Sequence, residues 1–194
     1  MLKSICVYCG SADDLHPDYY QAARNLGRAM GQRGTQLIYG AGRTGLMGAV
    51  ADGVLEVGGE VIGIMPRIFY TPTLVHAGLT RLEVMDDMHV RKARMVELAQ
   101  AFIALPGGFG TLDELFETLT WAQIGLHAKP VGLLNTRGYF DPLLHMVEHI
   151  RREGFIYNEH RDLFTQATEP DLLLATLDNH RPPQNLERWL NRDE

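Results

Sequence analysis

The chain alternates short runs of β-branched and aliphatic residues with longer amphipathic stretches, and this alternation restricts the fold more than any other feature of the sequence. It is typical of parallel βαβ units. The strand-like runs are residues 4–8, 36–39, 60–64, 81–85, 101–105 and 130–134. The helical stretches are residues 17–33, 45–57, 88–99, 111–124 and 141–152. We expect one α/β domain over residues 1–194, a Rossmann-like doubly wound parallel sheet with helices on both faces and a loosely held polar tail from about residue 181.

The loop after the fifth strand-like run carries the most functional information, because ligands of such sheets bind at the carboxyl ends of the strands. Pro106 ends the run, Gly107, Gly108 and Gly110 follow, and Thr111 is expected to open a helix. Glycines let a ligand approach main-chain N–H groups, and the helix N-terminus supplies unpaired donors. The loop therefore favours a phosphate site, with Thr111 either capping the helix or donating to the phosphate. The alternative is a tight strand-to-helix turn whose nearby acids only complement the helix dipole.

A second glycine-rich loop, residues 40–45, matches the letters of the dinucleotide fingerprint. The fingerprint requires an acid at the end of the next strand to hold the ribose. Here Glu60 begins that strand, and residues 65–66, Met-Pro, end it. We therefore expect the loop to form a second wall of one nucleotide pocket. The irregular segment 65–80 is a candidate lid or further wall.

Arg91, Lys92 and Arg94 place three cations near the start of a predicted helix, where positive charge opposes the helix dipole. A solvated helix face is one explanation. A bound anion is the other, and Arg91 is then the best candidate because a guanidinium binds phosphate or carboxylate through two parallel hydrogen bonds.

Two further patterns suggest chemistry that we do not expect here. His145 and His149 spell an inverted zinc-protease motif, but no third ligand stands nearby, so we predict no metal and an exposed helix face. Cys6 and Cys9 have redox spacing, but Cys6 lies within a strand-like run, which favours a buried apolar role.

Net charge and hydropathy indicate which classes of partner the protein is not expected to bind. A formal net charge of −6 argues against nucleic-acid binding, which depends on clustered Lys and Arg. No apolar run approaches the roughly 20 residues that cross a bilayer, and the N-terminus lacks the order of a signal peptide. We therefore expect no membrane partner and a cytoplasmic protein.

Residues 106–114, P-G-G-F-G-T-L-D-E, resemble the PGGxGTxxE motif of the LONELY GUY family, the cytokinin riboside 5'-monophosphate phosphoribohydrolases. Similarity continues in the same order over about residues 4–150, including residues 9–11, 39–48, 88–92 and 121–130. The chain departs from the family pattern at Ala41, Thr73 and Val90. The resemblance implies a homodimer without a cofactor that cleaves a small-molecule nucleoside 5'-monophosphate, AMP or an N6-prenylated relative, to free base and ribose 5-phosphate.

By resemblance, Arg91 and Glu114 take the positions of the family's essential pair. The candidate substrate-binding residues are Gly42, Thr73, Arg91, Lys92, Gly107, Gly108, Phe109, Gly110, Thr111, Leu112, Asp113, Glu114 and Thr120.

The expected chemistry resembles glycoside hydrolysis, in which positive charge builds on the sugar as the base leaves. Glu114 would stabilise that charge or activate water, and Arg91 would hold the 5'-phosphate. Two alternatives remain. One is a carrier that binds the nucleotide without cleaving it. The other is a pyridoxal-dependent lysine decarboxylase, for which the chain offers only Lys3, Lys92 and Lys129.

Overall fold

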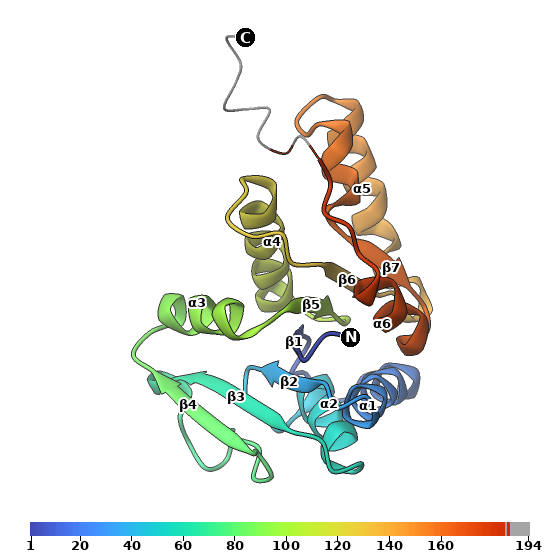
Figure 1. Ribbon diagram of the computed structural model, residues 1–194. Coiled ribbons are helices and arrows are strands. Elements are labelled where there is room, and N and C mark those ends of the chain that lie inside the picture. The colour runs from blue at the N-terminus through green and yellow to red at the C-terminus, as the bar shows by residue number, and fades with distance from the viewer. Residues whose placement is uncertain (185, 187–194) are drawn as a thin grey trace.

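The computed structural model describes residues 1–184 and 186, and these build a seven-stranded parallel sheet between two layers of helices (Figure 1). The strands are β1 (Ser4–Tyr8), β2 (Gln36–Tyr39), β3 (Val61–Pro66), β4 (Arg81–Met85), β5 (Ala101–Ala104), β6 (Val131–Leu134) and β7 (Thr165–Ala167). Their order is β4-β3-β2-β1-β5-β6-β7, and every pairing is parallel. The predicted Rossmann-like, doubly wound class is confirmed.

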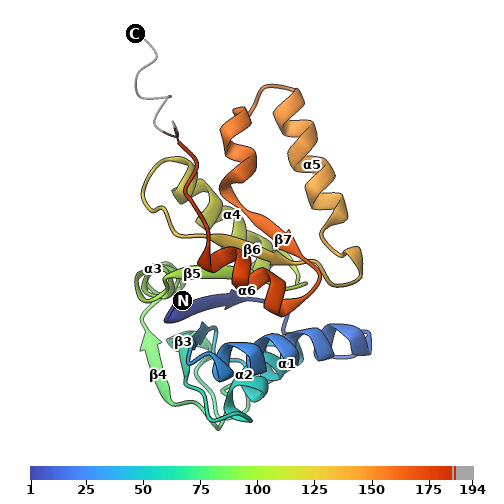
Figure 2. The same cartoon turned by 45° about the vertical axis from the view of Figure 1, so that its right-hand side comes forward.

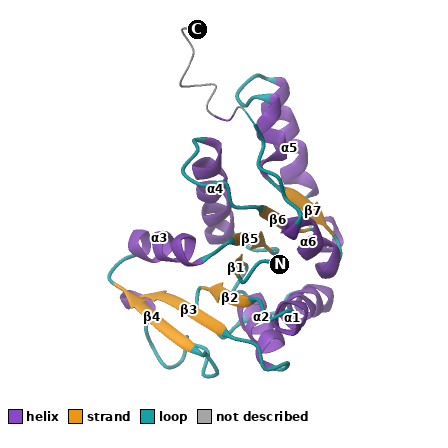
Figure 3. Ribbon diagram, viewed as in Figure 1, coloured by secondary structure: helices purple, strands orange, loops and turns teal. Residues whose placement is uncertain are grey.

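Helices cover both faces of this sheet (Figures 2 and 3). They are α1 (Pro17–Gln32), α2 (Gly45–Leu55), α3 (Met88–Leu98), α4 (Phe109–Gln123), α5 (Asp141–Arg152) and α6 (Pro170–Asp178), with short 3-10 turns η1 (Arg67–Phe69), η2 (Thr136–Gly138) and η3 (Asn158–Leu163). Helices α1, α2 and α6 pack on one face, and α3, α4 and α5 lie on the other (Figure 2).

Strand β1 shows how the sequence builds both layers. Ile5 and Val7 point into the core under α1, α2 and α6, whereas Cys6 and Tyr8 point into the core under α3 and α4. Because successive side chains of a strand face opposite sides, a strand buried on both faces must be apolar throughout, as β1 is. Cys6 and Cys9 are free and buried, as expected for Cys6, and burial raises the pKa of each thiol, so neither is a reactive thiolate.

The predicted elements are found, with boundaries within about two residues, but two elements were missed. β7 is a three-residue edge strand, Thr-Gln-Ala, without a β-branched run, and α6 follows it directly. Helix α4 begins at Phe109 rather than at Thr111. The tail expected from residue 181 lies mostly outside the described residues.

The chain changes direction in the sheet between β1 and β5, which is the topological switch point of this fold. The loops that leave these two strands run together. The Gly10 N–H donates to the Pro106 carbonyl at 3.0 Å, and the Leu105 N–H donates to the Tyr8 carbonyl at 2.9 Å. Ligands of doubly wound sheets bind in the crevice at such a point.

Candidate active site

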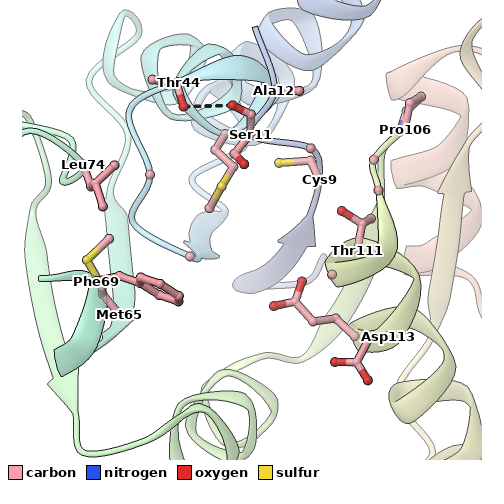
Figure 4. Close-up of a pocket in the computed structure, with 18 of the residues that line it drawn as sticks. Cys9, Ser11, Ala12, Thr44, Met65, Phe69, Leu74, Pro106, Thr111 and Asp113 are labelled. Carbon is pink, nitrogen blue, oxygen red and sulfur yellow. Dashed lines mark hydrogen bonds between the residues drawn. The ribbon is translucent and has the colours of Figure 1, made fainter.

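A cavity of about 810 Å³ opens at the carboxyl ends of the strands, above the switch point (Figure 4). The loops after β1, β2, β3 and β5 and the starts of α3 and α4 form its walls. The Thr44 hydroxyl donates to the Ser11 carbonyl at 2.9 Å and ties two of these loops together (Figure 4). The two glycine-rich loops predicted to share one pocket do so: Gly40 and Gly42 line the cavity opposite the loop after β5.

The N-terminus of α4 forms one end of the cavity. Gly107, Gly108, Gly110 and Thr111 all line it. Gly108 is the N-cap and makes no side-chain capping bond, so the first N–H groups of α4 have no capping side chain. The interpretation of Thr111 as the cap is wrong, because the helix starts two residues earlier. This helix end has the features of an anion site: open donors and the positive end of the helix dipole.

The three loop glycines are required for different reasons. A Cβ on Gly107 would lie 2.1 Å from Thr111 Oγ1 and 2.7 Å from the Gly10 nitrogen, so packing excludes any side chain there. A Cβ on Gly108 or Gly110 would meet no protein atom within 4 Å, and neither residue has a positive φ. Packing therefore explains Gly107, whereas neither packing nor backbone conformation explains Gly108 and Gly110, which leave open backbone at the cavity.

This contrast gives a matched pair of variants. We expect Gly107→Ala to destabilise the fold by about 1–3 kcal/mol, because the methyl group meets the backbone of Gly10. Gly110→Ala should leave the melting temperature unchanged or slightly raised, because alanine favours the helix, and should weaken binding of inorganic phosphate. Thermal unfolding with and without phosphate measures both effects. Unchanged phosphate binding in Gly110→Ala would contradict the assignment of the site to α4.

Arg91 and Glu114 both line the cavity and form an ion pair. Arg91 Nη1 lies 2.6 Å from Glu114 Oε1, and Arg91 Nε donates to the Ile64 carbonyl at 3.0 Å. The two side chains are only 9% and 14% exposed. A Cβ on Gly40 would lie 2.4 Å from Arg91 Nη2, so only glycine leaves room for the guanidinium. Burial raises the pKa of the Glu114 carboxyl above its ordinary value, and the Arg91 guanidinium opposes that rise.

Lys92 is held by two carboxylates of α4. Its Nζ lies 3.1 Å from Asp113 Oδ2 and 3.0 Å from Glu117 Oε1. Burial opposes the charged form, but the bonds to Glu117 and Asp113 prevail and raise the pKa of Lys92. The amine is therefore a fixed cation that fastens α3 to α4 beside Glu114.

Some predicted substrate-binding residues do not line the cavity. Phe109 is 94% exposed, and Leu112 also lies outside the lining. The Thr120 hydroxyl donates to the Phe116 carbonyl on the outer side of α4, and the Thr73 hydroxyl bonds to that of Thr71. Of the predicted residues the cavity brings together the following: Gly42, Arg91, Lys92, Gly107, Gly108, Gly110, Thr111, Asp113 and Glu114.

The cavity also has walls that no motif marked. Met65, Phe69 and Leu74 form an apolar side opposite Thr111 and Asp113 (Figure 4). The expectation that segment 65–80 forms a wall is confirmed for residues 65–74, although the residue predicted there, Thr73, is not part of the lining. At the end of the cavity formed by the N-terminus of α4, Tyr139 bonds to Gly107, and Tyr19 also lines the cavity; neither tyrosine was predicted.

Comparison with known proteins decides the family. A family model described as "Possible lysine decarboxylase" matches residues 47–177. The chain is 50% identical over 155 residues to a cytokinin riboside 5'-monophosphate phosphoribohydrolase of Rhodococcoides fascians, covering 79% of this chain and 78% of that protein. It is 43% identical over 180 residues to the rice enzyme LOG of Oryza sativa subsp. japonica, covering 93% and 74%. The chain belongs to the LONELY GUY (LOG) family.

The LOG fold extends to more distant proteins. A molybdenum cofactor binding protein of Rippkaea orientalis superposes with a TM-score of 0.71 at 22% identity, over 92% of this chain and 97% of that protein. At such identity the likeness describes the fold alone.

The lysines of this LOG protein do not suit pyridoxal phosphate, which the description of the family model would imply. A Schiff base requires a lysine that becomes neutral in the site. Among the described residues Lys92 alone of the lysines lines the cavity, and its two carboxylate partners favour the charged form. Lys3 is exposed on the N-terminal segment, and Lys129 Nζ donates to the Val96 carbonyl at 2.7 Å.

Proposed function

We propose that the protein hydrolyses the N-glycosidic bond of adenine-type nucleoside 5'-monophosphates and releases the free base and ribose 5-phosphate. The family membership supports this activity, and the site supplies suitable groups. The observation that carries the proposal is the buried Arg91–Glu114 pair, 2.6 Å apart, beside the open N-terminus of α4. A carboxylate next to a phosphate site weakens phosphate binding by repulsion, so its presence favours chemistry over simple capture.

The reaction breaks the bond between ribose C1' and the base nitrogen. The electron pair of that bond leaves with the base, which takes up a proton, and water oxygen bonds to C1'. Glu114 would stabilise the positive charge that develops at C1' or accept the proton of the attacking water. The α4 N-terminus would hold the 5'-phosphate and so fix the sugar against Glu114.

The apolar side of the cavity would receive the base. Met65, Phe69 and Leu74 lie across the cavity from Thr111 and Asp113, so a nucleotide with its phosphate on α4 would place its base toward them (Figure 4). Both a planar purine and an N6-prenylated purine suit such a surface.

Base release from a panel of nucleoside 5'-monophosphates tests the function. The panel contains AMP, N6-isopentenyl-AMP, GMP, CMP and UMP, each beside its free nucleoside, and chromatography measures the released base. We expect release from the adenine-type monophosphates and little from the nucleosides. A nucleotide that protects the protein against unfolding but is recovered intact would support the carrier instead.

We also propose that the working form is a homodimer built on the outer side of α4. Phe109, Phe116 and Ile124 are exposed along this helix at 94%, 36% and 41%, from its N-terminus beside the cavity to its C-terminal end. Exposed apolar patches of this kind mark interaction surfaces. Light scattering after gel filtration measures the mass, and a monomer at micromolar concentration would contradict the proposal.

We further infer that the chain acts as one nucleotide-binding domain, because its described strands join in one sheet between two cores. Among the described residues no helix is long and apolar enough to cross a membrane. A cytoplasmic location is our proposal, and the two free cysteines agree with a reducing compartment.

A further inference from the structure

Tyr139 contacts the glycine-rich loop after β5, and the proposed reaction assigns no role to this contact. Its hydroxyl donates to the Gly107 carbonyl at 2.5 Å, across 32 positions of sequence. Tyr139 itself is 38% exposed and lines the cavity, so water could satisfy both groups if the bond were absent. Burial therefore does not demand this hydrogen bond, and its effect is on the conformation of the loop.

The Gly107–Gly108 peptide is the group that this bond controls. In a trans peptide the carbonyl and the following N–H point in opposite directions, and the described residues contain no cis bond. A Gly107 carbonyl held toward Tyr139 therefore turns the Gly108 N–H away from Tyr139. Since glycine peptides rotate easily, an unrestrained peptide here would sample several orientations, whereas the bond to Tyr139 holds the Gly108 N–H in one orientation at the start of α4.

The turn after β6 holds Tyr139 in place. Asn135 is buried, and its Oδ1 accepts the Phe140 N–H at 2.7 Å while its Nδ2 donates to Asp141 Oδ1 at 2.8 Å. The Tyr139 ring contacts the ring of Phe140 edge-on at 5.0 Å between centroids.

A second ring and an ion pair connect this turn to α1. Tyr19 of α1 meets Tyr139 edge-on at 6.2 Å between centroids. Arg137, two residues before Tyr139, has φ +57° and its Nη1 lies 2.7 Å from Asp18 Oδ2. The turn that carries Tyr139 therefore follows β6 directly and is bonded to α1. From there the Tyr139 hydroxyl reaches the loop after β5.

We propose that Tyr139 is a positioning residue that orients the Gly107–Gly108 peptide for binding of the 5'-phosphate. The inference rests on the proposed function for the identity of the substrate. Its direct prediction concerns phosphate binding and requires no turnover.

The test compares Tyr139→Phe with Tyr20→Phe, which removes a hydroxyl from α1 outside the cavity lining. Calorimetry measures binding of inorganic phosphate and ribose 5-phosphate, and steady-state assays measure KM and kcat for the best monophosphate. We expect Tyr139→Phe to weaken both anions and raise KM by about five- to tenfold, the effect of one hydrogen bond, while kcat and melting temperature stay near wild type. Tyr20→Phe should behave as wild type.

Several outcomes separate the two proposals. Unchanged anion affinity in Tyr139→Phe would overturn the positioning role. Calorimetry with free adenosine, which has no phosphate, is the control ligand. An equal loss of affinity for phosphate and adenosine would also overturn the positioning role, as would a fall in melting temperature large enough to explain the loss, because each indicates general damage to the fold. A wild-type protein that binds neither anion would overturn it as well. If the wild type binds phosphate but releases no base, the hydrolase proposal fails while the loss of phosphate affinity in Tyr139→Phe still supports the positioning role.

Discussion

Replacing Glu114 with Gln should lower kcat for the best monophosphate by about 10³-fold, within the range that a positioned acid or base contributes. Gln keeps the shape of the side chain and an oxygen that can accept from Arg91, but it carries no charge to oppose an oxocarbenium-like centre and takes no proton from water. Affinity for the intact monophosphate should change only a few-fold, since the proposed phosphate site is the N-terminus of α4. Single-turnover base release and calorimetry together measure the two quantities.

Asp113→Asn is the matched control for this substitution. Asp113 is the adjacent carboxylate, lines the same cavity and is far more exposed, at 63% of its side chain against 14% for Glu114. The same loss of charge there should reduce kcat much less. Equal activity of Glu114→Gln and wild type would remove Glu114 from the chemistry, and equal losses in the two variants would indicate a shared electrostatic effect.

The sequence predicted the fold well because its strongest signal, buried strands alternating with amphipathic helices, reports local structure. It also predicted that the glycine loop and the start of the following helix line the cavity, since these residues are continuous in the chain. It could not predict that Arg91 bonds to Glu114, because that contact depends on how α3 and α4 lie against the sheet. The sequence hypothesis placed Arg91 on the 5'-phosphate, whereas the structure shows its Nη1 and Nε bonded within the protein.

The helical period of α4 explains the motif residues that lie elsewhere. Gly110 and Glu114 are one turn apart and both face the cavity. Phe109, Phe116 and Thr120 follow a different stripe of the same helix and face outward. A sequence motif alone does not show which of its residues lie on the cavity face of the helix and which lie on the outer face. Tyr139 carried no signal at all, because it comes from the turn after β6 and reaches Gly107 only through the order of the strands.

Removing the Arg91 guanidinium should move the acid limb of the pH–rate profile to higher pH. Burial raises the pKa of Glu114, and Arg91 opposes the rise, so Arg91→Ala should raise that pKa further. If the ionised carboxylate is the active form, activity is lost as the pH falls through this pKa, and the loss then begins at higher pH in the variant. At neutral pH we expect kcat/KM to fall by about 10²-fold or more, in keeping with removal of one partner of a buried pair. The profile of kcat/KM from acid to neutral pH measures the shift.

Two comparisons decide how Arg91 acts. The double variant Arg91→Ala with Glu114→Gln should be little worse than Glu114→Gln alone if Arg91 works through the carboxylate, because residues that act as a unit are not additive. Loss confined to monophosphates, with free nucleosides and the pH profile unaffected, would instead place the guanidinium on the 5'-phosphate. The buried 2.6 Å contact favours the first result.

Arg91→Lys should retain part of the activity, since it keeps the charge near Glu114 but cannot donate to both Glu114 and the Ile64 carbonyl in the same planar geometry.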